Sequence, residues 1–153
     1  MKNLIAIIAI IVGVGACAAP TNPPSEVRGA TATRGATAGD ISAYAAESEY
    51  YIMGISDELT RVSEAAGTGD TDYATGVCES ASATVESLWA DMPDAPDEVL
   101  QDLIDGAVMD TLTGFDACAD GDFDTATDAL TSAGDGWQAS TERVRALNAR
   151  AGR

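Results

Sequence analysis

The chain has no histidine, few aromatic residues and almost no lysine. Its 153 residues include two Trp, two Phe and four Tyr, and the only lysine is Lys2. Without His the chain lacks the most frequent general base and a common zinc ligand, and no Gly-x-Ser-x-Gly elbow or phosphate-binding loop is present. The carboxylates are spaced along helix surfaces instead of being isolated among apolar residues. We therefore expect no enzymatic activity and no cofactor.

Positive charge is scarce throughout. The net charge is −17, and residues 40–142 contain 24 Asp or Glu against one base, Arg61. Such a surface repels polyanions. We expect no nucleic acid among the partners of this chain.

The first residues combine a positive charge at Lys2, an apolar run over 4–14 and small residues at 15–16. This order is typical of a signal peptide, and the run is shorter than the roughly 20 residues of a membrane-spanning helix. Val14-Gly15-Ala16-Cys17 resembles the lipobox of a bacterial lipoprotein precursor. The resemblance implies cleavage after Ala16, a diacylglycerol on the sulfur of Cys17, and an acyl chain such as palmitate on its amino group.

An ordinary secretory signal, cut after Ala18 or Ala19, is the alternative. With the lipobox, the chain divides into a signal peptide (1–16), a lipidated cysteine with a disordered tether (17–39) and a helical domain (40–153). The tether consists largely of Ala, Thr, Gly, Pro and Arg, and has almost nothing that packs. We expect a protein that is lipid-anchored on the extracytoplasmic side of the cell membrane.

Apolar residues recur at intervals of three and four across the domain. The pattern predicts helices over about 41–66 with Asp40 as N-cap, from about 70–72 to the Pro93-x-x-Pro96 connection, over 97–119, and after an N-cap at Asp122. Four amphipathic helices with short connections predict an all-α, antiparallel four-helix bundle. The stripes predicted to face the core are Ile41, Tyr44, Tyr51, Ile55, Leu59 and Val62; Tyr73, Val77, Ala81, Val85 and Leu88; Leu100, Leu103, Ile104, Ala107, Val108, Leu112 and Phe115; and Phe123, Ala126, Leu130, Ala133, Trp137, Val144 and Leu147.

Cys78 and Cys118 remain when Cys17 carries lipid. Two cysteines in an oxidising compartment favour a disulfide. A hairpin that is symmetric about Pro93 misaligns them by about nine residues, or roughly 13 Å, whereas a bridge needs Cα atoms within about 7 Å. We therefore predict a bend near Gly106, so that residues 97–105 do not continue the helix in line.

A second resemblance covers residues 70–147. Cys78, the Pro93-x-x-Pro96 connection, Cys118-x-x-Gly121-Asp122 and the alanine-rich last helix together resemble small secreted or lipidated helical proteins of actinobacteria. Most of these proteins have no assigned function. The resemblance supports the helical fold and the disulfide and implies no activity.

An up-down bundle of four helices returns the chain to the end at which it began. The arginines that would meet at this end, and contact anionic lipid headgroups, are Arg28, Arg34, Arg143, Arg145, Arg150 and Arg153. The alternative is that the last arginines complement the C-terminal dipole of their helix.

At the opposite end, the spacing of Asp120-x-Asp122-x-Asp124 resembles the first positions of a calcium-binding EF-hand loop. Thr125 and Thr131 stand where that loop has Gly and Glu. These aspartates are therefore weak calcium candidates, and the alternative is that they are solvated helix caps.

These features favour a membrane-anchored, non-catalytic lipoprotein whose acidic helical domain binds another protein of the cell envelope. A second hypothesis is a phage- or prophage-encoded lipoprotein that confers superinfection exclusion or immunity, which phage genes nearby would support. A third hypothesis is a small-ligand carrier that uses the bundle interior.

Overall fold

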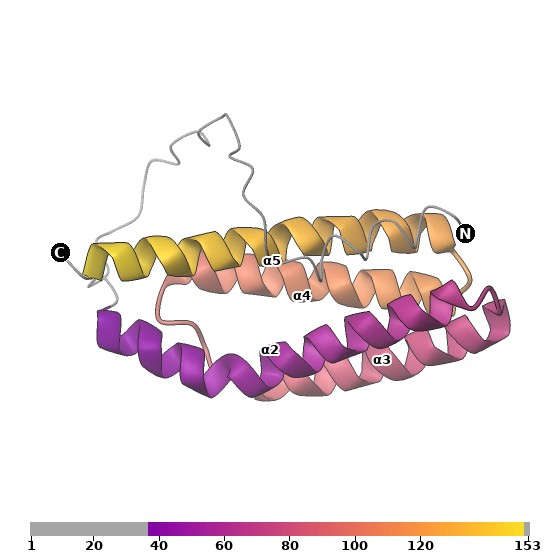
Figure 1. Cartoon of the computed structure of the whole chain (residues 1–153), viewed down its shortest axis with the longest axis horizontal. Coiled ribbons are helices and arrows are strands. Elements are labelled where there is room, and N and C mark those ends of the chain that lie inside the picture. The colour runs from indigo at the N-terminus through magenta and orange to yellow at the C-terminus, as the bar shows by residue number, and fades with distance from the viewer. Residues whose placement is uncertain (1–36, 152–153) are drawn as a thin grey trace.

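The computed structural model describes residues 37–151, which form four helices and no strand. The helices are α2 (Ala38–Gly67), α3 (Thr71–Asp91), α4 (Glu98–Ala119) and α5 (Phe123–Ala151). They run alternately in opposite directions, and each packs against the next (Figure 1). The predicted antiparallel four-helix bundle is confirmed.

The predicted signal peptide, Cys17, and the tether up to residue 36 lie outside the described residues. Among the helices that the structure describes, none combines the length and the apolar character needed to cross a membrane.

The first helix starts earlier than the sequence pattern indicates, so the prediction of Asp40 as its N-cap is wrong. Thr37 is the N-cap: its Oγ1 accepts a hydrogen bond from Asp40 N at 3.3 Å, and the Asp40 carboxylate accepts one from Thr37 N at 2.9 Å. This reciprocal capping box satisfies two backbone N–H groups that the start of a helix leaves free. Asp40 is therefore the third residue of α2.

The other predicted helix starts agree with the structure. Asp70 and Asp97 are the N-caps of α3 and α4, and each accepts a bond from the backbone N–H three residues later at 3.0 Å. α4 ends in a Schellman motif, in which Gly121 N donates to Cys118 O and Asp122 N donates to Ala117 O. Gly121 has a φ of +79°, which glycine adopts without a steric penalty.

The core lies along the centre of the bundle and contains most of the predicted stripes. Its largest fully buried side chains include Phe115, Ile55, Leu100 and Leu130. Tyr73, predicted to face the core, is 55% exposed instead. The small buried residues of α3, which are Ala74, Cys78, Ala81, Ser82 and Val85, set the face of that helix, and Tyr73 lies one position away from it.

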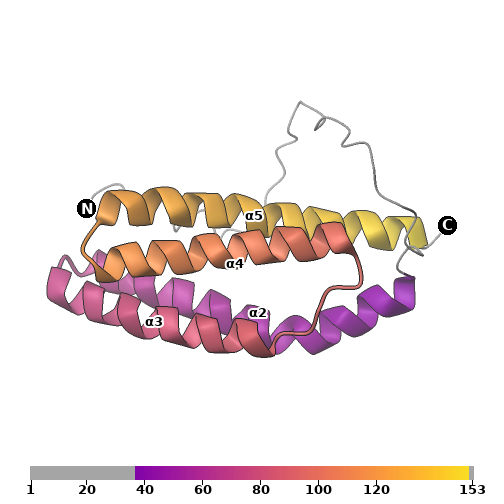
Figure 2. The same cartoon turned by 180° about the vertical axis from the view of Figure 1, so that it is seen from behind.

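Cys78 and Cys118 form the predicted disulfide, which joins α3 to α4 with their Cα atoms 5.9 Å apart. The predicted bend near Gly106 is wrong, because α4 is a continuous helix from Glu98 to Ala119. The connection over 92–97 removes the misalignment. Its backbone is extended at both Met92 and Asp97, and it runs on beyond the end of α3 before α4 begins (Figure 2). Six residues span about 20 Å at full extension, so the connection covers the offset of roughly 13 Å even though its backbone bends at 92 and at 96–97.

Helices α4 and α5 pack closely because glycines lie in their interface. A Cβ atom on Gly114 would lie 2.6 Å from Leu130 Cγ, and one on Gly136 would lie 3.0 Å from Ala107 Cβ. In contrast, α2 and α5 contact each other least among the helix pairs that touch. The bundle is therefore tight on the α4–α5 side and loose along the α2–α5 seam.

Candidate functional site

The bundle has two distinct ends. The start of α2, the α3–α4 connection and the end of α5 lie toward one end, which we call the terminal end (Figure 1). The α2–α3 and α4–α5 connections lie at the other, which we call the loop end. Both limits of the described chain are thus at the same end of the bundle.

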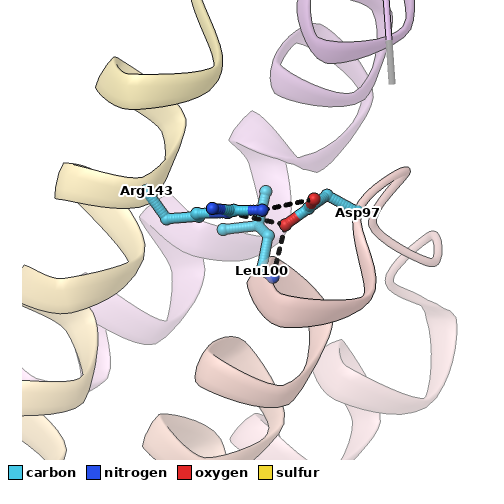
Figure 3. A network of polar contacts seen from close by, with 3 residues as sticks. All are labelled: Asp97, Leu100 and Arg143. Atoms are coloured by element: carbon cyan, nitrogen blue, oxygen red, sulfur yellow. Dashed lines mark hydrogen bonds and ion pairs between the residues drawn. The ribbon is translucent and has the colours of Figure 1, made fainter. Parts of the chain in front are cut away.

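An ion pair fastens α5 to the start of α4 near the terminal end (Figure 3). Arg143 donates from Nε to Asp97 Oδ1 at 2.8 Å and from Nη2 to Asp97 Oδ2 at 2.7 Å. Asp97 Oδ1 also accepts from Leu100 N as the N-cap of α4. The guanidinium lowers the pKa of the Asp97 carboxyl, chiefly through these hydrogen bonds, and the carboxylate raises the pKa of Arg143.

The predicted basic cluster is only partly described by the structure. Arg145 and Arg150 are exposed on α5, whereas Arg143 is used for the ion pair within the bundle. Arg28, Arg34 and Arg153 lie outside the described residues. The terminal end therefore offers two exposed arginines in the part of the chain that the structure covers.

The aspartates of the loop end cap helices. Asp122 accepts from Thr125 N at 3.1 Å and from Thr125 Oγ1 at 2.7 Å, and these bonds lower the pKa of its carboxyl. Asp120 is the C-cap residue of α4, and Asp124 lies in the first turn of α5. Within residues 37–151, no group of three Asp, Glu or Cys side chains is arranged to hold a metal ion.

A cleft of about 670 Å³ opens between α2, α4 and α5, toward the terminal end of the loose seam. The small residues Ala45 and Ala46 of α2 are part of its lining. Its wall is mainly apolar, with contributions from Ile41, Ile52, Met53, Leu100, Ile104 and Val144. Met53 is 57% exposed and Ile52 is 38% exposed.

The cleft wall also holds buried polar atoms without partners. Tyr44 Oη, Ser48 Oγ and Trp137 Nε1 are buried and make no hydrogen bond of standard geometry with the described residues, although the hydroxyls of Tyr44 and Ser48 lie close enough to interact with each other. All three belong to residues that line the cleft. Burial raises the pKa of the Tyr44 phenol, so the phenol keeps its proton and its ability to donate. The other tryptophan differs, because Trp89 Nε1 donates to Asp105 Oδ1 at 3.3 Å.

The sequence pattern placed Tyr44 and Trp137 on core stripes but did not identify the cleft that they line. A signal was present, because Ser48 falls one helical turn after Tyr44 on an otherwise apolar stripe, and Ser140 occupies an equivalent place on α5. Both serines are nearly completely buried, and both line the cleft.

No family model, no curated protein and no solved structure matches this chain. Two features stand out: the arrangement of the two ends of the bundle, and the apolar cleft with its unpaired donors.

Proposed function

We propose that the chain is a lipoprotein anchored through Cys17 to the extracytoplasmic side of the cell membrane, with an acidic, non-catalytic helical domain that binds a protein of the cell envelope. The observation that carries the proposal is that the start of α2 and the end of α5 lie at one end of the bundle. A tether of about 20 residues from Cys17 has a root-mean-square reach of about 25 Å. The terminal end then stays near the membrane, and the loop end faces outward.

The charge of the domain supports a basic protein partner. Asp70, Asp72, Asp120, Asp122 and Asp124 are all exposed at the loop end. Complementary charge speeds association and excludes acidic competitors. A partner with a basic surface would therefore meet the loop end first.

Three carboxylates at helix starts have structural roles, which supports a non-catalytic function for these residues. Hydrogen bonds lower the pKa of the carboxyls of Asp40, Asp97 and Asp122. A general acid that works near neutral pH needs the opposite shift. Each of the three carboxylates instead stabilises the start of a helix.

Intact-mass analysis of protein purified from bacterial membranes tests the anchor. We expect the mass of residues 17–153 plus acyl chains, and a gain of two hydrogens after reduction of the disulfide between Cys78 and Cys118. A mass that begins after Ala18 or Ala19 and carries no lipid contradicts the anchor.

A photo-crosslinking amino acid tests the partner. Placed at Asp72, at the loop end, it should capture one envelope protein, and the yield should fall as salt is raised. Placed at the exposed Asn148, near the terminal end, it should not capture that protein. Equal capture from both positions, or capture that salt does not weaken, contradicts a partner held by the acidic loop end.

A further inference from the structure

We propose that the cleft between α2, α4 and α5 binds an uncharged lipid that carries a carbonyl group, such as a fatty acyl ester. This site goes beyond the anchored interaction domain proposed above and does not depend on it. The size, the polar atoms and the charge of the cleft each restrict the ligand.

The size and wall of the cleft fit a small apolar molecule. Its volume of about 670 Å³ lies within the range of small-molecule sites in proteins. The exposed surface inside it is mostly apolar, and Ile52 and Met53 at its edge are exposed. An acyl chain would cover this surface and remove it from water.

The unpaired donors define the polar part of the ligand. Nearly all buried polar groups in proteins have a hydrogen-bond partner, yet Trp137 Nε1 has none, the hydroxyls of Tyr44 and Ser48 have at most each other, and all three residues line the same cleft. The indole N–H of Trp137 can only donate, so its partner must be an acceptor. A carbonyl oxygen with two lone pairs supplies that acceptor once the side chains that cover the buried indole N–H shift to admit it.

The charges around the cleft favour an uncharged ligand. Only Glu49 and Arg145 among the lining residues are charged, they have opposite signs, and both are exposed residues. No cation in the wall is therefore buried where it would pair with a carboxylate or phosphate. The net charge of −17 also repels anions from the whole chain.

The same observations argue against a protein segment in the cleft. The backbone carbonyls of a docked helix are already bonded within that helix, so they leave the indole N–H of Trp137 unpaired. A second copy of the chain would bring another net charge of −17 to the contact. A lipid carbonyl satisfies the donors without bringing charge.

Binding of three matched probes tests the proposal. The full chain with Cys17→Ser, which carries no attached lipid, is purified without detergent. Trp89→Phe leaves Trp137, which lines the cleft, as the only tryptophan. Monolauroylglycerol should change the Trp137 fluorescence saturably, at about tenfold lower concentration than laurate or dodecane, because only the ester offers a neutral acceptor.

Matched alanine variants locate the binding. Ala45 lines the cleft, whereas Ala43 is exposed on the same helix and does not line it. Ala45→Phe should abolish binding of monolauroylglycerol, and Ala43→Phe should leave it unchanged. Thermal unfolding of both variants checks that they fold.

Donor variants separate hydrogen bonding from packing. Tyr44→Phe and Ser48→Ala should weaken monolauroylglycerol binding several-fold and leave the weak binding of dodecane unchanged. The proposal is overturned if no probe binds saturably, if dodecane or laurate binds as well as the ester, or if Ala45→Phe binds normally. It is also overturned if the chain is a dimer that Ala45→Phe dissociates, because the cleft is then a contact between copies.

Discussion

At the residue scale, two buried helical serines differ in their hydrogen bonds. Ser48 in α2 is 1% exposed and unpaired, whereas Ser82 in α3 is 7% exposed and donates to Asp116 Oδ1 at 2.6 Å. We expect Ser48→Ala to leave the free energy of unfolding unchanged or raise it by up to about 1 kcal/mol, because it removes an unsatisfied hydroxyl. Urea unfolding measures the change.

Ser82→Ala is the matched control, because both substitutions replace a buried helical serine by the better helix former. It should lower the free energy of unfolding by about 0.5–1.5 kcal/mol through loss of the bond to Asp116. Equal losses in the two variants would mean that Ser48 has a partner.

The ion pair between Asp97 and Arg143 makes stability depend on pH. The folded pKa of Asp97 lies below its ordinary value of 3.8, so its contribution is complete above that value and is lost as the pH falls through the folded pKa. Asp97→Asn keeps an N-cap residue but loses the charge. We expect it to lower the free energy of unfolding by about 1–2 kcal/mol at pH 7 and progressively less below pH 4.

Denaturant unfolding between pH 2 and pH 7 measures the effect of Asp97→Asn. Asp102→Asn is the control, because Asp102 is exposed on the same helix and forms no ion pair in the described structure. A difference between Asp97→Asn and the parent chain that stays constant over this range would show that the titration of Asp97 does not contribute.

At the element scale, replacing either of two glycines of α4 by alanine should change the free energy of unfolding in opposite directions. A Cβ atom on Gly114 would lie 2.6 Å from Leu130 Cγ and 3.3 Å from Ala126 O, whereas one on Gly106 meets nothing within 4 Å. Gly106→Ala should raise the free energy of unfolding by about 0.5–1 kcal/mol. Gly114→Ala should lower it by about 1–3 kcal/mol, because the side chain of Leu130 or the α5 backbone must shift to admit the methyl group.

Thermal unfolding of both glycine variants gives the comparison. Gly106→Ala also tests the straight course of α4. If Gly106→Ala destabilises the chain, the helix needs glycine at this position, and the continuous α4 is contradicted.

The disulfide between α3 and α4 closes a loop with a sequence separation of 40. In the chain-entropy model, such a loop stabilises the folded state by about 4 kcal/mol, and measured values run from about 2 kcal/mol upward. The double variant Cys78→Ala, Cys118→Ala should lose stability of this order in urea while circular dichroism still reports helix below the transition. Unfolding that is the same with and without a reducing agent would contradict the bridge.

The element pattern was predictable because helix signals are local. The periodicity gave all four helices, and the N-caps at Asp70, Asp97 and Asp122 follow from their own side chains. The first cap was misplaced because Thr37 and Asp40 are both short polar residues that can cap a helix, and only Ala38 and Gly39 separate them. The prediction chose Asp40, which stands next to the first apolar residue, whereas Thr37 lies beside a Gly-rich stretch. The bend near Gly106 was wrong because the reach of the 92–97 connection depends on its backbone angles, which periodicity does not report.

The cleft was less predictable, because it depends on how far two helices diverge. The residues on its wall carry ordinary core periodicity, and Tyr44 and Trp137 are indistinguishable in the sequence from residues of a closed seam. A serine on an apolar stripe was the only local sign. The Asp97–Arg143 pair likewise joins residues 46 positions apart, so only the topology brings them together.

At the scale of the whole molecule, the charge of the domain is poorly balanced. Two ion pairs occur within residues 37–151, Arg61 with Glu58 and Arg143 with Asp97. They leave most of the 24 carboxylates of residues 40–142 without a basic partner. The helix caps hold a few of these carboxylates by hydrogen bonds, but the rest repel one another across a compact bundle.

This imbalance predicts that salt stabilises the chain. Folding brings the carboxylates closer together than they are in the expanded unfolded chain, so their repulsion is stronger in the folded state. Raising the salt from 0.01 M to 0.5 M shortens the Debye length from about 30 Å to below 8 Å. We expect the free energy of unfolding to rise by roughly 1–2 kcal/mol over this range.

Urea unfolding at a series of sodium chloride concentrations, at pH 7, measures this rise. Screening should level off near 0.5 M, whereas the exclusion of salt from the surface would continue to increase stability at higher concentration. Repeating the series at pH 3 is the control, because protonation of the carboxyls removes most of the repulsion and should flatten the response. A fall in stability with salt at pH 7 would mean that the few ion pairs outweigh the unpaired carboxylates.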